Sequence, residues 1–151
     1  MGSATSDGAR RPCAQPKARR LQNASILVVE DEALIAMDLQ SILEEAGYNV
    51  LDPVGAVAKA FAFLEGSTPD LALLDVNLGG VDVFDLADVL ASRNIKMIFL
   101  TGHSVRRLPD GHRHRVLVSK PFLPGAVLEA IRRELSRSEE NTQAGEPIGR
   151  V

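Results

Sequence analysis

Short runs of apolar residues alternate along the chain with longer segments in which apolar residues recur every three or four positions. Uninterrupted apolar runs are typical of strands buried on both faces of a parallel sheet, which helices cover from both sides. One such run, 71–74, ends at Asp75 and is followed by the turn signal Gly79-Gly80. We therefore predict strands at these positions: 25–29, 49–54, 70–75, 97–100 and 116–118.

Segments with helical spacing follow the strands. Apolar residues three and four positions apart form one face of an amphipathic helix. We predict such helices from the apolar positions within these ranges: 35–46, 57–64, 83–90 and 127–135. The first should stop at Gly47, since glycine favours helix ends. The stretch 103–115 is polar and basic and contains Pro109 and Gly111, so we expect a poor helix there at best.

The alternation of strand and helix predicts an α/β fold. It favours a flavodoxin-like, doubly wound sheet of five parallel strands with helices on both faces. We expect the strand order 2-1-3-4-5, counted along the chain, because Pro53 interrupts the second strand and proline is confined to sheet edges. This order also puts the first and third strands side by side at the switch point, where such sheets bind ligands.

Composition changes this picture little. The chain has 151 residues, 45% of them hydrophobic and 25% charged, with a net charge of −3, as expected for one globular domain without nucleic-acid or membrane partners. No apolar run approaches the roughly 20 residues that span a bilayer, and no secretory signal is visible. We expect a cytoplasmic protein with a disordered basic tail at 1–24, a folded domain at 25–137 and a flexible tail at 138–151.

Polar residues capable of chemistry stand where the predicted strands end. They are Glu30 and Asp31 after the first strand, Asp75 at the end of the third, Thr101 after the fourth and Lys120 after the fifth. The carboxyl ends of parallel strands share one sheet edge, so we expect these side chains to converge. Three carboxylates brought close together repel one another, and Mg²⁺, which prefers oxygen ligands, relieves that repulsion.

The same set suits phosphoryl transfer. A carboxylate such as that of Asp75 can act as a nucleophile toward phosphorus, while Lys120 and Thr101 neutralise charge on the transferred group. Taken singly, each residue also fits a structural role: Asp31 or Asp75 as a helix cap, Thr101 in a turn, and Lys120 on the surface. The ordered combination favours a joint site over coincidence.

These residues and their neighbours resemble the receiver domain of two-component response regulators. The resemblance extends from residue 25 to about residue 137. Its motifs are Val28-Val29-Glu30-Asp31-Glu32, Leu73-Leu74-Asp75-Val76-Asn77-Leu78, Phe99-Leu100-Thr101-Gly102 and Ser119-Lys120-Pro121-Phe122.

The resemblance implies a role for each residue of the site. Asp75 would be the phosphoacceptor, Asp31 a direct Mg²⁺ ligand, Glu30 a ligand acting through water, and Asn77 a ligand through its backbone carbonyl. Thr101 and Lys120 would be the switch hydroxyl and the phosphate-facing cation. A sensor histidine kinase, or a histidine phosphotransfer protein, would supply the phosphoryl group. No enzymatic activity is implied beyond self-phosphorylation and self-dephosphorylation.

Two departures from the family pattern stand out. Leu117 occupies a position three before the lysine that usually holds an aromatic residue, and the stretch between Thr101 and Lys120 is short. Both traits resemble a subset of stand-alone receivers that work with histidine-tryptophan-glutamate type sensor kinases. We expect phosphorylation to order residues 103–115 instead of rotating a single ring.

Only a short tail follows the last helix. We therefore expect the domain to signal by contact with an unknown downstream protein, or to act as a phosphate shuttle or sink.

Several alternatives remain open. A Mg²⁺-dependent phosphatase or phosphotransferase of the haloacid-dehalogenase type would place a second aspartate where Asn77 stands, and a docking-only receiver would have lost the phosphorylation chemistry.

The histidines of the 103–115 stretch lack zinc-site spacing, so we expect a solvated basic loop. Those histidines are His103, His112 and His114. The aspartates spaced by three, Asp82, Asp85 and Asp88, would form a solvated helix face or, alternatively, a docking patch.

Overall fold

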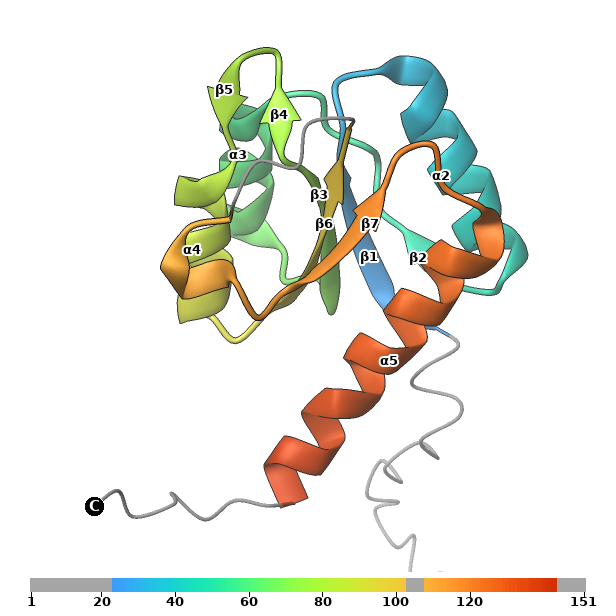
Figure 1. Cartoon of the computed structure of the whole chain (residues 1–151), viewed down its shortest axis with the longest axis vertical. Helices are drawn as coiled ribbons and strands as arrows, with labels where there is room; N and C mark the ends of the chain where they lie inside the picture. The colour runs from blue at the N-terminus through green and yellow to red at the C-terminus, as the bar shows by residue number, and fades with distance from the viewer. Residues whose placement is uncertain (1–22, 103–107, 144–151) are drawn as a thin grey trace, which may run out of the picture.

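A computed structural model describes residues 23–102 and 108–143 of the chain as a five-stranded parallel sheet covered by helices on both faces (Figure 1). The sheet order is β2-β1-β3-β6-β7, which confirms the predicted order of its five strands. The strands are β1 (Ser25–Val29), β2 (Asn49–Val50), β3 (Leu71–Asp75), β6 (Lys96–Thr101) and β7 (Val116–Ser119). The apolar runs thus form the centre of the sheet, as their composition predicts.

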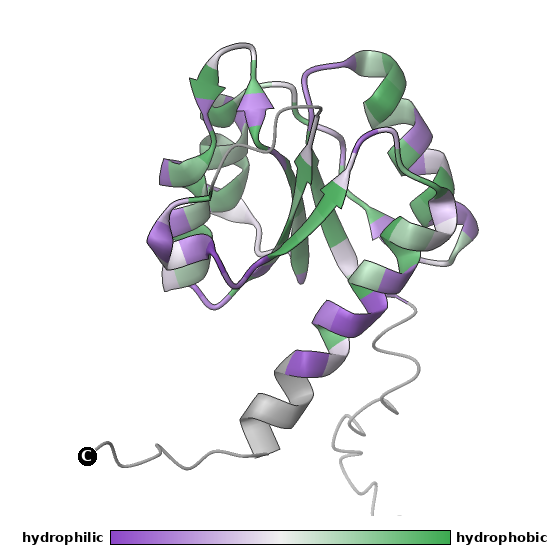
Figure 2. Cartoon of the chain, in the orientation of Figure 1, coloured by the Kyte–Doolittle hydropathy of each residue, from purple (hydrophilic) through white to green (hydrophobic). Residues whose placement is uncertain are grey.

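Helices cover the two faces of the sheet in pairs. These helices are α2 (Ala33–Glu45), α3 (Val57–Gly66), α4 (Phe84–Ser92) and α5 (Pro124–Gln143). One core packs α2 and α5 against the sheet through residues such as Leu39 and Ile131, and the other packs α3 and α4 through Leu64 and Leu90. Figure 2 shows the apolar sheet enclosed between these layers. None of the helices in the described part of the chain is long and apolar enough to cross a membrane.

Strand register brings the carboxyl ends of the central strands to one edge. Val29 of β1 pairs with Leu74 of β3, and Asp75 at the end of β3 pairs with Leu100 of β6. Thr101, the last residue of β6, pairs with Ser119 of β7. Every strand end that carries a predicted site residue therefore lies along the same edge, next to a small two-stranded hairpin (Figure 1).

That hairpin was not predicted. It consists of β4 (Asn77–Leu78) and β5 (Val81–Asp82), antiparallel and joined at Gly79-Gly80, so the turn signal marks a hairpin tip before α4 begins at Phe84. Both glycines have positive φ, 57° and 85°, which glycine adopts without strain from a Cβ atom. Asp82 consequently lies in β5 and only Asp85 and Asp88 lie on α4.

Other boundaries also differ from the predictions. β2 is shorter than the predicted strand 49–54, because the chain leaves the sheet before Pro53 and rejoins it only at an isolated bridge between Val54 and Val29. The last helix continues through Gln143, beyond the expected domain boundary at residue 137. The predicted tails lie largely outside the described residues.

The connection between β6 and β7 is described from Leu108 onward. Residues 108–115, called the crossover below, contain one 3₁₀ turn, η1 (Asp110–His112). This short turn agrees with the expected poor helix, and residues 103–107 of the predicted stretch lie outside the described residues. Leu108 and His112 are buried, so the crossover is folded against the sheet.

Candidate functional site

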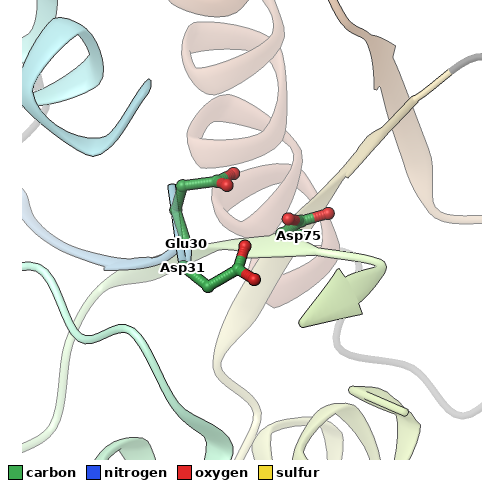
Figure 3. A group of neighbouring side chains, drawn as sticks. All are labelled: Glu30, Asp31 and Asp75. Atoms are coloured by element: carbon green, nitrogen blue, oxygen red, sulfur yellow. The ribbon is translucent and has the colours of Figure 1, made fainter. Parts of the chain in front are cut away.

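Three carboxylates meet at the carboxyl edge of the sheet. Glu30 and Asp31 follow β1 and Asp75 ends β3, and one oxygen from each lies within 4.8 Å of the others (Figure 3). Glu30 and Asp75 are 2% and 5% exposed, whereas Asp31 is open to solvent. The structure therefore brings together the acidic residues that the sequence placed at two different strand ends.

Backbone hydrogen bonds hold these carboxylates in place from both sides. The Glu30 amide donates to the carbonyl of Val54 at 3.0 Å, which ties the end of β1 to the edge of the sheet. The amide of Val76 donates to the carbonyl of Leu100 at 2.9 Å and continues the pairing of β3 past Asp75. These two hydrogen bonds extend the strand pairing by one residue past the ends of β1 and β3. The acidic side chains therefore project from a rigid backbone.

Lys120 completes the group. Its Nζ donates to Oε2 of Glu30 at 2.6 Å and lies 3.1 Å from Oδ2 of Asp75. The residue follows β7, its amide donates to the Thr101 carbonyl at 2.7 Å, and its peptide bond to Pro121 is cis. Burial alone would lower the pKa of Lys120, but the hydrogen bonds to the two carboxylates outweigh it and raise that pKa, so the side chain stays a cation.

One lysine does not neutralise the cluster. Burial, together with the nearby charge of Asp75, raises the pKa of Glu30 to about 7, although the hydrogen bond from Lys120 opposes this rise. A buried carboxylate whose pKa is raised this far has too little positive charge around it. Three converging carboxylate oxygens with one solvent-facing ligand are the donor set that Mg²⁺ favours, so these residues fit that ion.

Mg²⁺ binding should weaken as the pH falls below about 7, the pKa of Glu30. A proton on Glu30 has to leave before the carboxylate can help to hold a cation, so we expect about tenfold weaker binding at about pH 6 than at about pH 8. Calorimetric titration with Mg²⁺ at both pH values measures this difference. The variant Glu30→Gln should bind more weakly with much less pH dependence; a wild-type affinity that is the same at both pH values would contradict the prediction.

The hairpin after β3 closes one side of the cluster. The amide of Asn77 donates to Oδ1 of Asp75 at 3.1 Å, and the side chain of Asn77 accepts from the amide of Gly80 at 3.0 Å. A Cβ atom on Gly79 would lie 3.7 Å from Oδ2 of Asp31, so the hairpin tip runs close to the acidic pair. Asn77 therefore orients Asp75 and stabilises the tip, while the role predicted for its backbone carbonyl stays a prediction.

Thr101 lies at the same edge but is less firmly held. The residue is buried at the end of β6, and within the described part of the chain its hydroxyl has only a long contact of 3.5 Å with the carbonyl of its neighbour Gly102. A contact of this length contributes little as a hydrogen bond. Thr101 joins the carboxylates through the backbone hydrogen bond that the Lys120 amide donates to its carbonyl.

His112 was placed wrongly by the sequence reasoning. It was expected in a solvated basic loop, but its ring is buried at 3% exposure, and Nε2 lies 2.7 Å from Oδ1 of Asp88 on α4. The ring also stacks on Phe84 and meets Phe99 edge-on. His114 is exposed as expected, and His103 lies outside the described residues. No spacing signal pointed to His112, because its partner is 24 residues away along the chain.

Comparison with known proteins identifies relatives over most of the chain. A family model described as the response regulator receiver domain matches residues 26–132. The transcriptional regulatory protein PdtaR of Mycobacterium tuberculosis is 36% identical over 121 residues, 78% of this chain and 59% of the relative. The phyllosphere-induced regulator PhyR of Methylorubrum extorquens is 35% identical over 73% of this chain and 43% of the relative. The chain thus spans about half the length of these curated relatives.

A solved structure agrees with these matches. The solution structure of SdrG from Sphingomonas melonis Fr1 superimposes with a TM-score of 0.68 at 39% sequence identity, covering 76% of this chain and 98% of that one. The similarity in fold thus extends over nearly the whole of a protein that is itself little larger than the described domain.

Proposed function

Because the chain belongs to the response regulator receiver domain family, we propose that it takes a phosphoryl group from a phosphohistidine onto Asp75. One observation carries this proposal. The Asp75 carboxylate stands at the sheet edge with the Lys120 ammonium 3.1 Å away and two further carboxylates within 4.8 Å. This arrangement supplies a nucleophile, a fixed cation and a place for a second cation at one point.

The proposed reaction is an in-line phosphoryl transfer. An Asp75 oxygen attacks phosphorus while the bond from phosphorus to the donor's imidazole nitrogen breaks, which leaves an acyl phosphate on Asp75 and a free histidine on the donor. Lys120 offsets the negative charge of the phosphoryl oxygens, and the Thr101 hydroxyl donates a hydrogen bond to one of them. Attack of water on phosphorus later returns the Asp75 carboxylate and releases inorganic phosphate.

Mg²⁺ would be held by Asp31 and Asp75 directly, by Glu30 through water, and by the backbone carbonyl of Asn77. When bound, the ion supplies positive charge to the phosphoryl oxygens and to the carboxylates. The raised pKa of Glu30 supports this assignment, since it indicates that Lys120 alone does not balance the buried negative charge.

The donor in this proposal is a sensor histidine kinase, with a histidine phosphotransfer protein as the other possible source. The phosphorylated domain then contacts an unknown downstream protein, or passes on or drains the phosphoryl group, in the cytoplasm and without binding nucleic acid. Catalysis is confined to the domain's own phosphorylation and dephosphorylation. The histidine-tryptophan-glutamate class of kinases is the donor class that we propose.

Intact mass tests the proposal. Incubation with acetyl phosphate and Mg²⁺ should add one phosphoryl group, about 80 Da, to the protein, and peptide mapping should locate it on Asp75. Chelating the Mg²⁺ should prevent the addition. If acetyl phosphate fails as donor, a phosphorylated histidine kinase replaces it.

Two outcomes would favour the alternatives. Rapid turnover of a free phosphomonoester would favour a Mg²⁺-dependent phosphatase. Absence of any uptake from both donors would refute the proposal and leave a receiver that acts only by docking.

A further inference from the structure

The buried ring of His112 connects the crossover to α4 and to β6. Its Nε2 is hydrogen-bonded to Asp88 of α4, while its faces and edges meet Phe84 and Phe99 at ring-centre distances of 6.3 and 5.8 Å. Phe84 and Phe99 also contact each other, with centres 5.9 Å apart. Three rings therefore form one closed cluster, which we call the His112 cluster, and Asp88 sets the orientation of its only polar ring.

This cluster lies on the sheet face that also carries Thr101. Side chains alternate along a strand, so Phe99 and Thr101, two positions apart on β6, point to the same face. The register neighbour of Phe99 on β7 is Leu117, a side chain that is itself 39% exposed. Phe99 is nevertheless fully buried, and His112 supplies cover on this side.

The backbone and the side chain of Thr101 are fixed differently. Pairing with Ser119 and the hydrogen bond from the Lys120 amide hold the backbone. Among the described residues, the hydroxyl has only its 3.5 Å contact with the carbonyl of Gly102, so hydrogen bonding within this part of the chain does not fix the rotamer of Thr101.

We propose that His112, held by Asp88, is a positioning residue that orients the Thr101 hydroxyl through Phe99. The proposal rests on the proposed function for its kinetic readout. Without the hydrogen bond to Asp88 the His112 ring can turn, Phe99 shifts with it, and the Thr101 side chain loses its preferred rotamer. The residues that would hold Mg²⁺ stand on other strands and in the β4–β5 hairpin, and are not disturbed.

The hydrogen bond to Asp88 has a defined direction. Nδ1 of His112 is buried and has no partner among the described residues, so a proton on that nitrogen would be an unsatisfied buried donor. The proton therefore sits on Nε2, which donates to the Asp88 carboxylate. An asparagine at position 88 can still accept this bond through its side-chain oxygen, whereas an alanine cannot.

The test compares Asp88→Ala with Asp88→Asn, each in the wild type and in the Thr101→Val background. With acetyl phosphate and saturating Mg²⁺, Asp88→Ala should slow phosphorylation of Asp75 by about two- to tenfold, the range that one net hydrogen bond supports. Asp88→Asn should retain most of the rate. In Thr101→Val, which lacks the hydroxyl, Asp88→Ala should cause no further loss, because both changes act on the same group.

Control variants separate positioning from general damage. Asp85→Ala removes a charge from the same helix, and Leu43→Ala weakens the core on the opposite face of the sheet, so neither should change the rate in a Thr101-dependent way. The Mg²⁺ affinity should be unchanged in Asp88→Ala. Equal slowing by Asp88→Ala in both backgrounds would overturn the proposal, because the effect would then not pass through Thr101.

A structural measurement decides the question without phosphorylation. The three-bond NMR couplings that report χ1 of Thr101 should indicate one rotamer in the wild type and in Asp88→Asn, and rotamer averaging in Asp88→Ala. Identical couplings in all three proteins would refute the positioning role. If the wild type took up no phosphoryl group, the proposed function would fail, and these couplings would still decide the role of His112.

Discussion

Asp75→Asn is expected to abolish phosphoryl uptake from either donor while leaving the domain folded. Asparagine has the shape of aspartate, and its side-chain oxygen can still accept the 3.1 Å hydrogen bond from the Asn77 amide. A neutral amide is not a competent nucleophile toward phosphorus, so no acyl phosphate forms. The pKa of Glu30 should also fall in this variant, because the charge of Asp75 helps to raise it. Intact mass and a carboxyl NMR titration measure the two effects.

A matched variant tests whether the effect is specific to the site. Asp70→Asn changes the other end of the same strand region, where Asp70 accepts a 2.7 Å hydrogen bond from the Ser25 amide. It should leave uptake intact. Uptake of a full phosphoryl group by Asp75→Asn at wild-type rate would show that the acceptor lies elsewhere and would remove Asp75 from its proposed role.

The sequence was sufficient to predict the central sheet, because its strands carry an unambiguous signal. Continuous apolar runs such as 71–74 are typical of a strand covered on both faces, and the alternation with helices leaves few possible strand orders. The predicted grouping of Glu30, Asp31, Asp75 and Lys120 follows from the same topology, since parallel strands end at one edge. The distances among these side chains could not have been predicted, because they depend on rotamers.

Features that depend on contacts distant in sequence were missed. His112 is in a polar, basic stretch whose composition favours solvent exposure, yet it is buried and packs against Phe84 and Phe99. Asp88 likewise belongs to a regular row of acidic residues, yet the fold gives it a buried partner. A pattern limited to nearby positions contains no information on such pairs.

The ends of several strands and helices were predicted incorrectly, for a third reason. β2 ends early because Pro53 has no amide hydrogen for the sheet, although the residues around it are suited to a strand. The hairpin β4–β5 is too short to produce a visible alternation, and its two glycines alone indicate no more than a turn. The continuation of α5 to Gln143 lacks apolar spacing, so periodicity did not reveal it.

Lys120→Met is expected to produce the largest loss of stability at the site, and the loss should depend on Mg²⁺. Removing the ammonium leaves the carboxylates of Glu30 and Asp75 buried without their cation, which should lower the free energy of unfolding by about 3 kcal/mol near neutral pH. Mg²⁺ should restore much of this loss, since it binds the folded state and supplies the missing charge. Urea unfolding with and without Mg²⁺ measures both effects.

The pH dependence of this loss follows from the carboxylates. Lys120 lowers the pKa of Glu30, so its removal raises further a pKa that already lies above the ordinary value of 4.5. A carboxyl with a raised pKa in the folded state loses stability as the pH rises, because folding then requires a proton that the unfolded chain has already released. The loss in Lys120→Met should therefore shrink in mildly acidic solution, where Glu30 becomes protonated.

Lys96→Met is the matched control for this prediction. Lys96 is half-buried at the opposite end of β6, and its Nζ donates to the carbonyl of Glu134 at 2.9 Å. Losing that hydrogen bond should cost about 1 kcal/mol, with no contribution from Mg²⁺. If Mg²⁺ stabilised both lysine variants and the wild type equally, Lys120 would not be balancing the same carboxylates as the metal. The prediction that Mg²⁺ and Lys120 supply positive charge to the same carboxylates would then be wrong.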